Sequence, residues 1–121
     1  MVRISLLAAL GLALLTSACK SPLVACNLNL VYGLTIVVTD SSTGAPLGGV
    51  QTVVEVRDGA YMETLPEIFP NEYSGAGERP GTYSVKVQRP GYRVWQNDGV
   101  RVRKDECHVI PVTVNARLQA L

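Results

Sequence analysis

Three cysteines and a single histidine have the most specific chemistry in this chain. Cys19 and Cys26 lie seven positions apart near the N-terminus, whereas Cys107 lies far downstream and is followed directly by His108. A thiol can be modified covalently, pair as a disulfide or bind a metal, and an imidazole can act as a base or a ligand. The sequence around these residues indicates which of these uses applies.

The first eighteen residues have the pattern of an export signal. Arg3 is followed by an apolar run, Ile4–Leu15, and then by the small residues Thr16–Ala18. A positive start, an apolar core and a small-residue exit are typical of signal peptides. The run is also shorter than the ~20 residues that a membrane-spanning helix needs. We therefore expect residues 1–18 to be removed during export.

The stretch Leu15-Thr16-Ser17-Ala18-Cys19 resembles the lipobox of bacterial lipoproteins. In that family the chain is cut before the cysteine, whose thiol then carries a diacylglyceryl group. Thr16 departs from the leucine that is usual there, and ordinary signal peptidase also accepts these small residues. The cysteine count favours lipidation, because a lipid at Cys19 leaves two thiols that can pair rather than an odd number.

The resemblance implies a membrane anchor at Cys19. The two or three acyl chains of this family hold a protein stably, whereas a single chain does not. Lys20 rather than aspartate follows the cysteine, which by family analogy favours the outer membrane in an organism that has one. We expect an extracytoplasmic lipoprotein of the cell envelope, periplasmic or surface exposed, with residues 19–27 as its lipidated tether.

The mature chain is electrically balanced. The whole sequence has eleven basic and ten acidic residues, so removal of Arg3 with the signal leaves ten of each. This balance argues against a nucleic-acid partner, which requires a basic face. The local cluster of Arg101, Arg103 and Lys104 is interpreted as an exposed strand face ending in a turn, because acidic residues follow at once. The remaining length suits one domain with a real core.

Apolar residues alternate with polar ones along most of the mature chain, which is strand patterning. The expected strands lie around residues 30–39, 50–56, 61–65, 83–87, 93–96, 100–103 and 110–118. Turn sequences separate them at Asp40–Pro46, Asp58-Gly59, Arg89–Gly91 and Asn97–Gly99. We predict an all-β fold, an antiparallel β-sandwich of about seven strands.

Residues 66–81 are expected to form the longest loop, because three prolines discourage a central strand there. Tyr73 in this loop is expected to be the most exposed of four aromatic residues. Together with Tyr61, Tyr92 and Trp95 it could form a glycan-binding or protein-binding patch. The competing interpretation, which we favour, is that Tyr92 and Trp95 pack in or near the core.

Three motifs together resemble the carboxypeptidase regulatory-like domain: Asp40-x-x-Thr43-Gly44-x-Pro46, Gly81-Thr-Tyr83-Ser-Val85-Lys-Val87 and Gly91-Tyr92. The resemblance spans roughly residues 28–118 and implies a transthyretin-like sandwich, but its motifs are structural and say little about function. An immunoglobulin domain fits less well, because Trp95 lies just before the second cysteine. The predicted organisation is a signal peptide at 1–18, a tether at 19–27 and a sandwich domain at 28–121.

Cys26 precedes the first expected strand, and Cys107 precedes the last. Two such cysteines in a small exported sandwich are good candidates for a disulfide. The alternative is a pair of buried free thiols.

His108 raises the question of catalysis or metal binding. It has a single adjacent thiol, whereas a structural zinc site needs four ligands. It could in principle act with Ser41, Ser42, Ser74 or Ser84, but the chain contains no G-x-S-x-G sequence. Four acids that could suggest calcium, Asp58, Asp98, Asp105 and Glu106, are also common in metal-free hairpins. We therefore predict no catalytic residue, cofactor or metal.

The sequence thus predicts a non-catalytic binding or structural module, not an enzyme, whose partner in the envelope is a protein or a glycan. Two alternatives stay open. One is a small envelope enzyme that uses His108. The other is an accessory subunit of an envelope assembly, joined by strand addition at a free sheet edge.

Overall fold

The computed structural model describes residues 25–121, so Cys19 and the predicted signal peptide lie outside the described residues. Within this part of the chain no helix has the length and apolarity needed to cross a bilayer. The strands are β1 (Tyr32–Asp40), β2 (Val53–Asp58), β3 (Tyr61–Thr64), β4 (Glu67–Phe69), β5 (Glu72–Gly77), β6 (Gly81–Gln88), β7 (Trp95–Val102) and β8 (Val112–Leu118).

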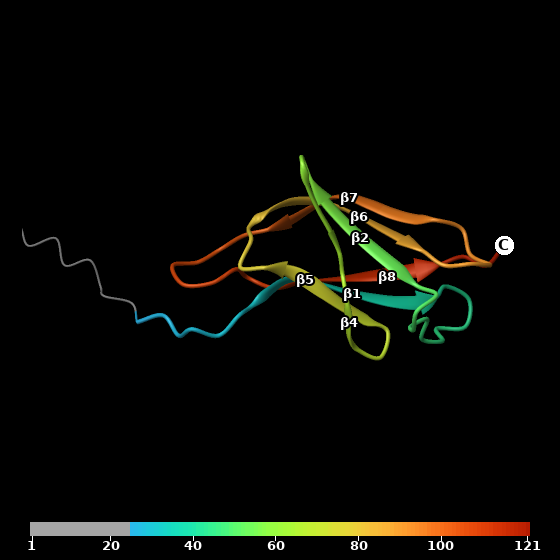
Figure 1. Ribbon diagram of the computed structural model, residues 1–121. Coiled ribbons are helices and arrows are strands. Elements are labelled where there is room, and N and C mark those ends of the chain that lie inside the picture. The colour runs from blue at the N-terminus through green and yellow to red at the C-terminus, as the bar shows by residue number, and fades with distance from the viewer. Residues whose placement is uncertain (1–24) are drawn as a thin grey trace, which may run out of the picture.

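The strands form two sheets of four, in the orders β4-β5-β1-β8 and β3-β2-β6-β7 (Figure 1). The predicted β-sandwich is confirmed, with eight strands in place of about seven. One pairing departs from the antiparallel pattern, because β1 and β8 run parallel, with Leu34 opposite Val112. Parallel pairing is possible because β2–β7 follow β1 in sequence and bring the chain back to the end of the sandwich where β1 begins.

The core lies between the two sheets. On β1, Leu34, Ile36 and Val38 are fully buried, whereas the alternating residues Thr35, Val37 and Thr39 face outward and are partly exposed. This is the two-residue periodicity expected of a strand with one face on the core. The other large side chains that are fully buried are Val54, Val56, Tyr83, Val85, Val87 and Leu118.

The prediction of a loop over residues 66–81 is wrong, because this segment contains the hairpin β4–β5. Pro66 and Pro80 stand just before strands and Pro70 lies in the turn, so none of the three removes a central ladder hydrogen bond. Tyr73 consequently points inward and is only 3% exposed. Its hydroxyl donates to the carbonyl of Gly49 at 3.2 Å, so it lies in the core and not on a binding surface.

The predicted turn at Asn97–Gly99 is a bulge inside β7. Tyr83 pairs with Val100 and Val85 with Asn97, so the β7 side has one extra residue. Gly99 has φ +74, the left-handed conformation that makes glycine the favoured residue in such bulges. Sequence patterning does not distinguish this glycine-bearing bulge from a turn.

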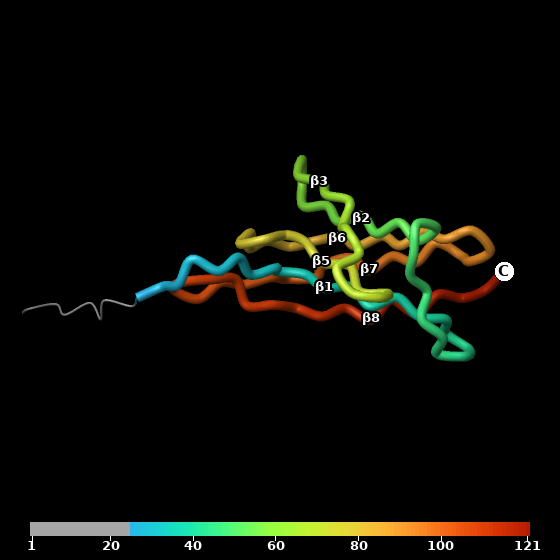
Figure 2. The backbone as a smooth tube through the Cα atoms, turned by 60° about the horizontal axis from the view of Figure 1, so that its bottom comes forward, coloured from blue at the N-terminus to red at the C-terminus, as the bar shows by residue number. Residues whose placement is uncertain are grey.

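The molecule is elongated, and its two ends differ (Figure 2). We call the end where the N-terminal segment joins the sandwich the proximal end; it contains residues 26–31, 78–82 and 101–111. The opposite, distal end contains residues 40–52, 89–94 and 119–121. β1 and β6 run from the proximal to the distal end, and β7 runs back.

Asp40 organises the distal end. One of its carboxylate oxygens accepts the amides of Ser42 and Thr43 at 2.8 and 3.0 Å, and the other accepts the hydroxyl of Tyr92 at 2.8 Å. The amide of Thr43, the Tyr92 hydroxyl and the amide of Ser42 lower the pKa of Asp40 below its usual value. Gly91, at φ +84, turns the chain so that Tyr92 reaches this carboxylate. The Asp40 and Gly91-Tyr92 motifs are therefore in contact.

We predict that Asp40→Asn lowers the free energy of unfolding at pH 7, and that the difference from wild type becomes smaller as the pH falls. A carboxyl whose folded pKa is lowered adds stability above its unfolded pKa of about 3.9, and this is lost as pH falls through the folded value. Urea unfolding from pH 7 to pH 2.5 tests this, with Tyr92→Phe as a control that keeps the carboxylate. A difference between wild type and Asp40→Asn that stays constant with pH would contradict the assignment.

Candidate functional site

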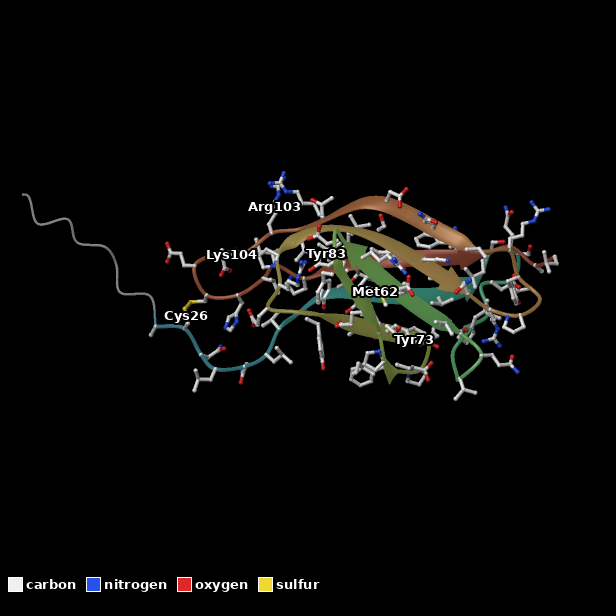
Figure 3. The ribbon with its side chains drawn as sticks, turned by 45° about the horizontal axis from the view of Figure 1, so that its top comes forward. Cys26, Met62, Tyr73, Tyr83, Arg103 and Lys104 are labelled. Carbon is white, nitrogen blue, oxygen red and sulfur yellow. A yellow bond between two sulfur atoms is a disulfide. The ribbon has the colours of Figure 1, made fainter. Side chains whose placement is uncertain are left out.

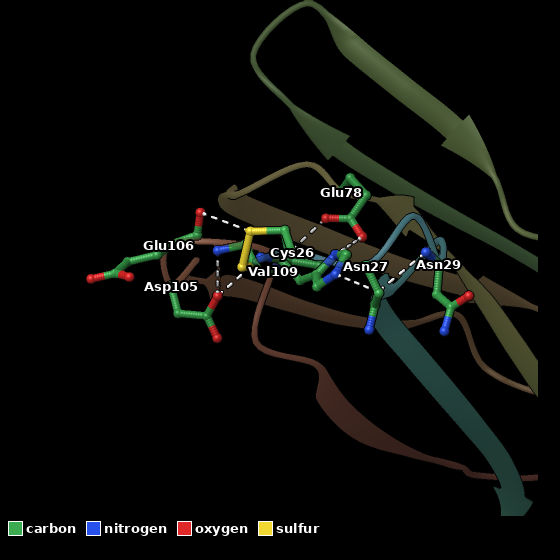
Figure 4. Close-up of a disulfide and its surroundings, with 9 residues drawn as sticks. Cys26, Asn27, Asn29, Glu78, Asp105, Glu106 and Val109 are labelled. Carbon is green, nitrogen blue, oxygen red and sulfur yellow. Dashed lines mark hydrogen bonds and ion pairs between the residues drawn. A yellow bond between two sulfur atoms is a disulfide. The ribbon is translucent and has the colours of Figure 1, made fainter. Parts of the chain in front are cut away.

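The proximal end brings together the residues that the sequence singled out for chemistry. Cys26 and Cys107 form a disulfide across 81 residues of sequence, with their Cα atoms 5.2 Å apart (Figure 4). The predicted pairing is confirmed. It ties the N-terminal segment to the β7–β8 connection, and the Cys26 sulfur also lies 3.8 Å from the carbonyl oxygen of Glu106.

Glu78, in the β5–β6 turn, is the polar centre of this end. One carboxylate oxygen accepts the amide of Val31 at 2.8 Å and contacts Nδ1 of His108 at 2.6 Å. The other oxygen accepts the amide of Val109 at 3.4 Å. Partial burial acts to raise the pKa of Glu78, but the hydrogen bonds from His108 and the two amides outweigh it, so the pKa lies below its usual value.

His108 is held at both ring nitrogens. Nδ1 contacts Glu78, and Nε2 lies 2.9 Å from the side-chain oxygen of Asn27. That Asn27 oxygen already accepts the amide of Asn29 at 3.2 Å. Both ring nitrogens therefore have a hydrogen-bond partner, one in the β5–β6 turn and one in the N-terminal segment. A ring held in this way clamps three segments together and has no free nitrogen to act as a base.

Asp105 shapes the loop that bears the cysteine. Its carboxylate accepts the amides of His108 and Cys107 at 2.9 and 2.8 Å, and these two bonds lower its pKa below the usual value. Asp105, which the sequence suggested as a possible calcium ligand, instead binds backbone amides of its own loop. In residues 25–121 no group of three or more histidine, cysteine or acidic side chains is placed to hold a metal ion.

The serines considered as partners for His108 lie elsewhere. Ser41 and Ser42 belong to the distal turn, where the amide of Ser42 is bonded to Asp40. Ser74 is bonded to Thr35 on the outer face of its sheet, at 2.9 Å. Ser84 lies on the other sheet, in β6. Among residues 25–121, the hydrogen bonds of His108 are to Asp105, Glu78 and Asn27 and not to a serine.

The four aromatic candidates do not share one surface. Tyr73 is buried and Tyr92 is bonded to Asp40 at the distal end, as described above. Tyr61 lies under Arg79, whose guanidinium carbon is 3.9 Å from the ring centroid. Trp95 is partly buried against the core, as Tyr92 is, which confirms the interpretation of these two residues as packing residues.

Arg79 was not singled out from sequence. Its guanidinium binds Asp58 at 2.9 Å and the hydroxyl of Tyr83 at 3.0 Å, and that hydroxyl donates to the Arg79 carbonyl at 2.7 Å. Gly81 leaves room beside them, since a Cβ there would force the Asp58 carboxylate to shift and would crowd Arg79. The glycine and tyrosine of the second motif therefore serve this network, and their only sequence signal was the motif itself.

A basic hollow lies next to the disulfide loop. It has a volume of about 560 Å³ and is lined by the Pro80–Thr82 segment at the start of β6 and by residues 101–104 at the end of β7. Arg101, Arg103 and Lys104 are all exposed. Within residues 25–121 none of these three cations has a carboxylate partner. The predicted basic cluster is exposed as expected, and Figure 3 shows Arg103, Lys104 and Cys26 at the same end of the molecule.

Comparison with known proteins does not assign the chain to a family. No family model matches the sequence, and no curated protein matches it.

The disulfide makes a testable contribution to stability. We predict that replacing both Cys26 and Cys107 by serine lowers the free energy of unfolding by about 2–5 kcal/mol, since the bridge closes a long loop. Denaturant unfolding of the mature chain, with Cys19→Ser in every sample, measures this. Wild-type protein treated with a reductant should show the same loss. An unchanged unfolding midpoint in both samples would contradict it.

Proposed function

We propose that the protein is a membrane-anchored lipoprotein of the cell envelope that acts as a non-catalytic binding or structural module. The observation that carries the proposal is the pairing of Cys26 with Cys107. It leaves Cys19 as the one cysteine outside the bridge, at the position where the lipobox resemblance puts the lipid. A disulfide also suits the oxidising compartment to which an export signal leads.

The hydrogen bonds around His108 at the proximal end support a non-catalytic role. His108 is the chain's only histidine, and both of its ring nitrogens are engaged by Glu78 and Asn27. A general base needs a nitrogen within reach of a substrate proton, whereas this ring holds a loop. The alternative of an enzyme that uses His108 therefore finds no support in the geometry around it.

We propose further that the domain is of the carboxypeptidase regulatory-like type. The two-sheet sandwich agrees with what that family implies, and two of the three motifs meet through the bond from Tyr92 to Asp40. The third motif supplies Gly81 and Tyr83 to the Arg79 network. Such motifs indicate a fold but do not identify a substrate or a partner.

An accessory subunit of an envelope assembly is a second candidate, favoured by the edge strand β4. This strand ends its sheet, and its side chains Ile68 and Phe69 are 41% and 65% exposed. An exposed apolar edge strand can pair with a strand from another protein.

Lipidation at Cys19 gives the first test. The intact mass of membrane-extracted protein should exceed that of the chain starting at Cys19 by a diacylglyceryl group, with or without a further acyl chain. Cys19→Ser should move the protein into the soluble fraction. The matched control, Cys26→Ser with Cys107→Ser, removes two other cysteines and should stay with the membrane. An unmodified Cys19 in the extracted wild type would overturn the anchor.

The edge strand gives the second test. A photo-crosslinking residue at Phe69 should trap one abundant protein neighbour in intact cells if β4 joins an assembly. The control position is Arg117 on β8, the opposite edge of the same sheet, which should not trap that neighbour. The same pattern from both positions, or no adduct from Phe69, would count against strand addition at β4.

A further inference from the structure

We propose that the basic hollow at the proximal end binds the phosphate-bearing headgroups of anionic phospholipids in the membrane that holds the anchor. This inference rests on the proposed function, because the anchor brings this end to the bilayer. It goes further in assigning a ligand class to Arg101, Arg103 and Lys104, and in fixing which end of the domain faces the lipid.

The hollow has the chemistry of a phosphate site. Arg101 lies directly opposite Thr82 in the β6–β7 ladder, so a guanidinium and a hydroxyl flank the same space. Arg103 and Lys104 follow on the same wall. Guanidinium groups donate paired hydrogen bonds to phosphate oxygens, and an ammonium group adds a compact charge. The absence of carboxylate partners among the described residues leaves these cations available for an external anion.

The position of the hollow also points to the bilayer. Cys26 is bonded to Cys107, three residues beyond Lys104, so the tether leaves the domain beside the hollow. Cys26 lies seven positions after Cys19, which is at most about 25 Å of extended chain. A lipid at Cys19 therefore keeps the proximal end within reach of the headgroups.

Two exposed leucines accompany the cations. Leu28 and Leu30 are 103% and 62% exposed and line a groove of about 490 Å³, in which Lys104 lies beside Glu78, Asp105 and Glu106. Apolar side chains next to basic ones are typical of protein surfaces that lie in the membrane interface.

Among the described residues, no acidic side chain lines the hollow itself. Glu78 is paired with His108, Asp58 with Arg79, and the carboxylate of Asp105 holds two backbone amides. Glu106 is exposed at the loop and does not line the hollow. The three cations therefore form a local positive surface on a chain whose overall charge is balanced.

Co-sedimentation with vesicles tests the site apart from the anchor. The protein is the chain from residue 19 to 121 with Cys19→Ser, which includes every residue of the buried core. Vesicles of equal parts phosphatidylglycerol and phosphatidylcholine are compared with phosphatidylcholine alone at low salt. Each basic residue near an anionic surface strengthens binding about fivefold, so Arg103→Gln with Lys104→Gln should weaken binding by about 25-fold.

The matched control is Arg93→Gln with Arg117→Gln, which removes the same charge from exposed positions outside the hollow. It should retain wild-type binding. Equal loss in both double variants, or equal binding to both kinds of vesicle, would overturn the proposal. So would binding of free glycerol phosphate, seen as shifted amide resonances of Gly81 and Thr82, without binding to vesicles.

The two proposals fail separately. An unmodified Cys19 in the mass measurement removes the anchor and leaves the vesicle result unaffected. A lipidated Cys19 with no difference between the double variants keeps the lipoprotein and removes the headgroup site.

Discussion

The disulfide between Cys26 and Cys107 is the constraint on which the arrangement of the proximal end depends. It joins the incoming chain to the β7–β8 connection, and Glu78 adds the β5–β6 turn through Val31, His108 and Val109. Three segments that are distant in sequence thus meet at one point. Because the bond fixes residue 26, whatever precedes it leaves the domain beside Lys104.

Acidic side chains that hold backbone amides recur through the loops. Asp40, Glu67, Glu78 and Asp105 each accept two amides, and the pKa of each is lowered. Amide groups in loops lack ladder partners, and a carboxylate satisfies two of them with one charge. Many of the acids are therefore structural, because they hold loop backbone in place.

The β-sandwich could be predicted from sequence because strand alternation is a local signal, and the disulfide because only two cysteines are left to pair once Cys19 is assigned to the lipid. Alternation along Leu34–Val38 marks a strand, and two cysteines that flank the strands can pair. The turn at Asp40–Pro46 was likewise predictable from its own residues, and the structure confirms it.

What sequence could not supply was long-range pairing. Tyr73 lies in a proline-rich stretch that reads as a loop, but its burial depends on β5 pairing with β1. The partner of His108 is Glu78, thirty positions away, and nothing in either local sequence indicates the other. The basic cluster could be identified in the sequence, but the hollow beside it forms only when Thr82 and Arg101 pair across β6 and β7.

The proposed orientation, with the proximal end of the domain facing the bilayer, is tested most directly by the depth of labelled residues in the bilayer. Nitroxide labels introduced as an unnatural amino acid at Ile110 or Val94, both exposed, leave the disulfide intact. In lipidated protein on anionic vesicles, collision with membrane-soluble oxygen should place Ile110 at the headgroups. Val94, one strand length away or about 25 Å, should contact only water-soluble reagents. Equal distances of the two labels from the bilayer would contradict the account.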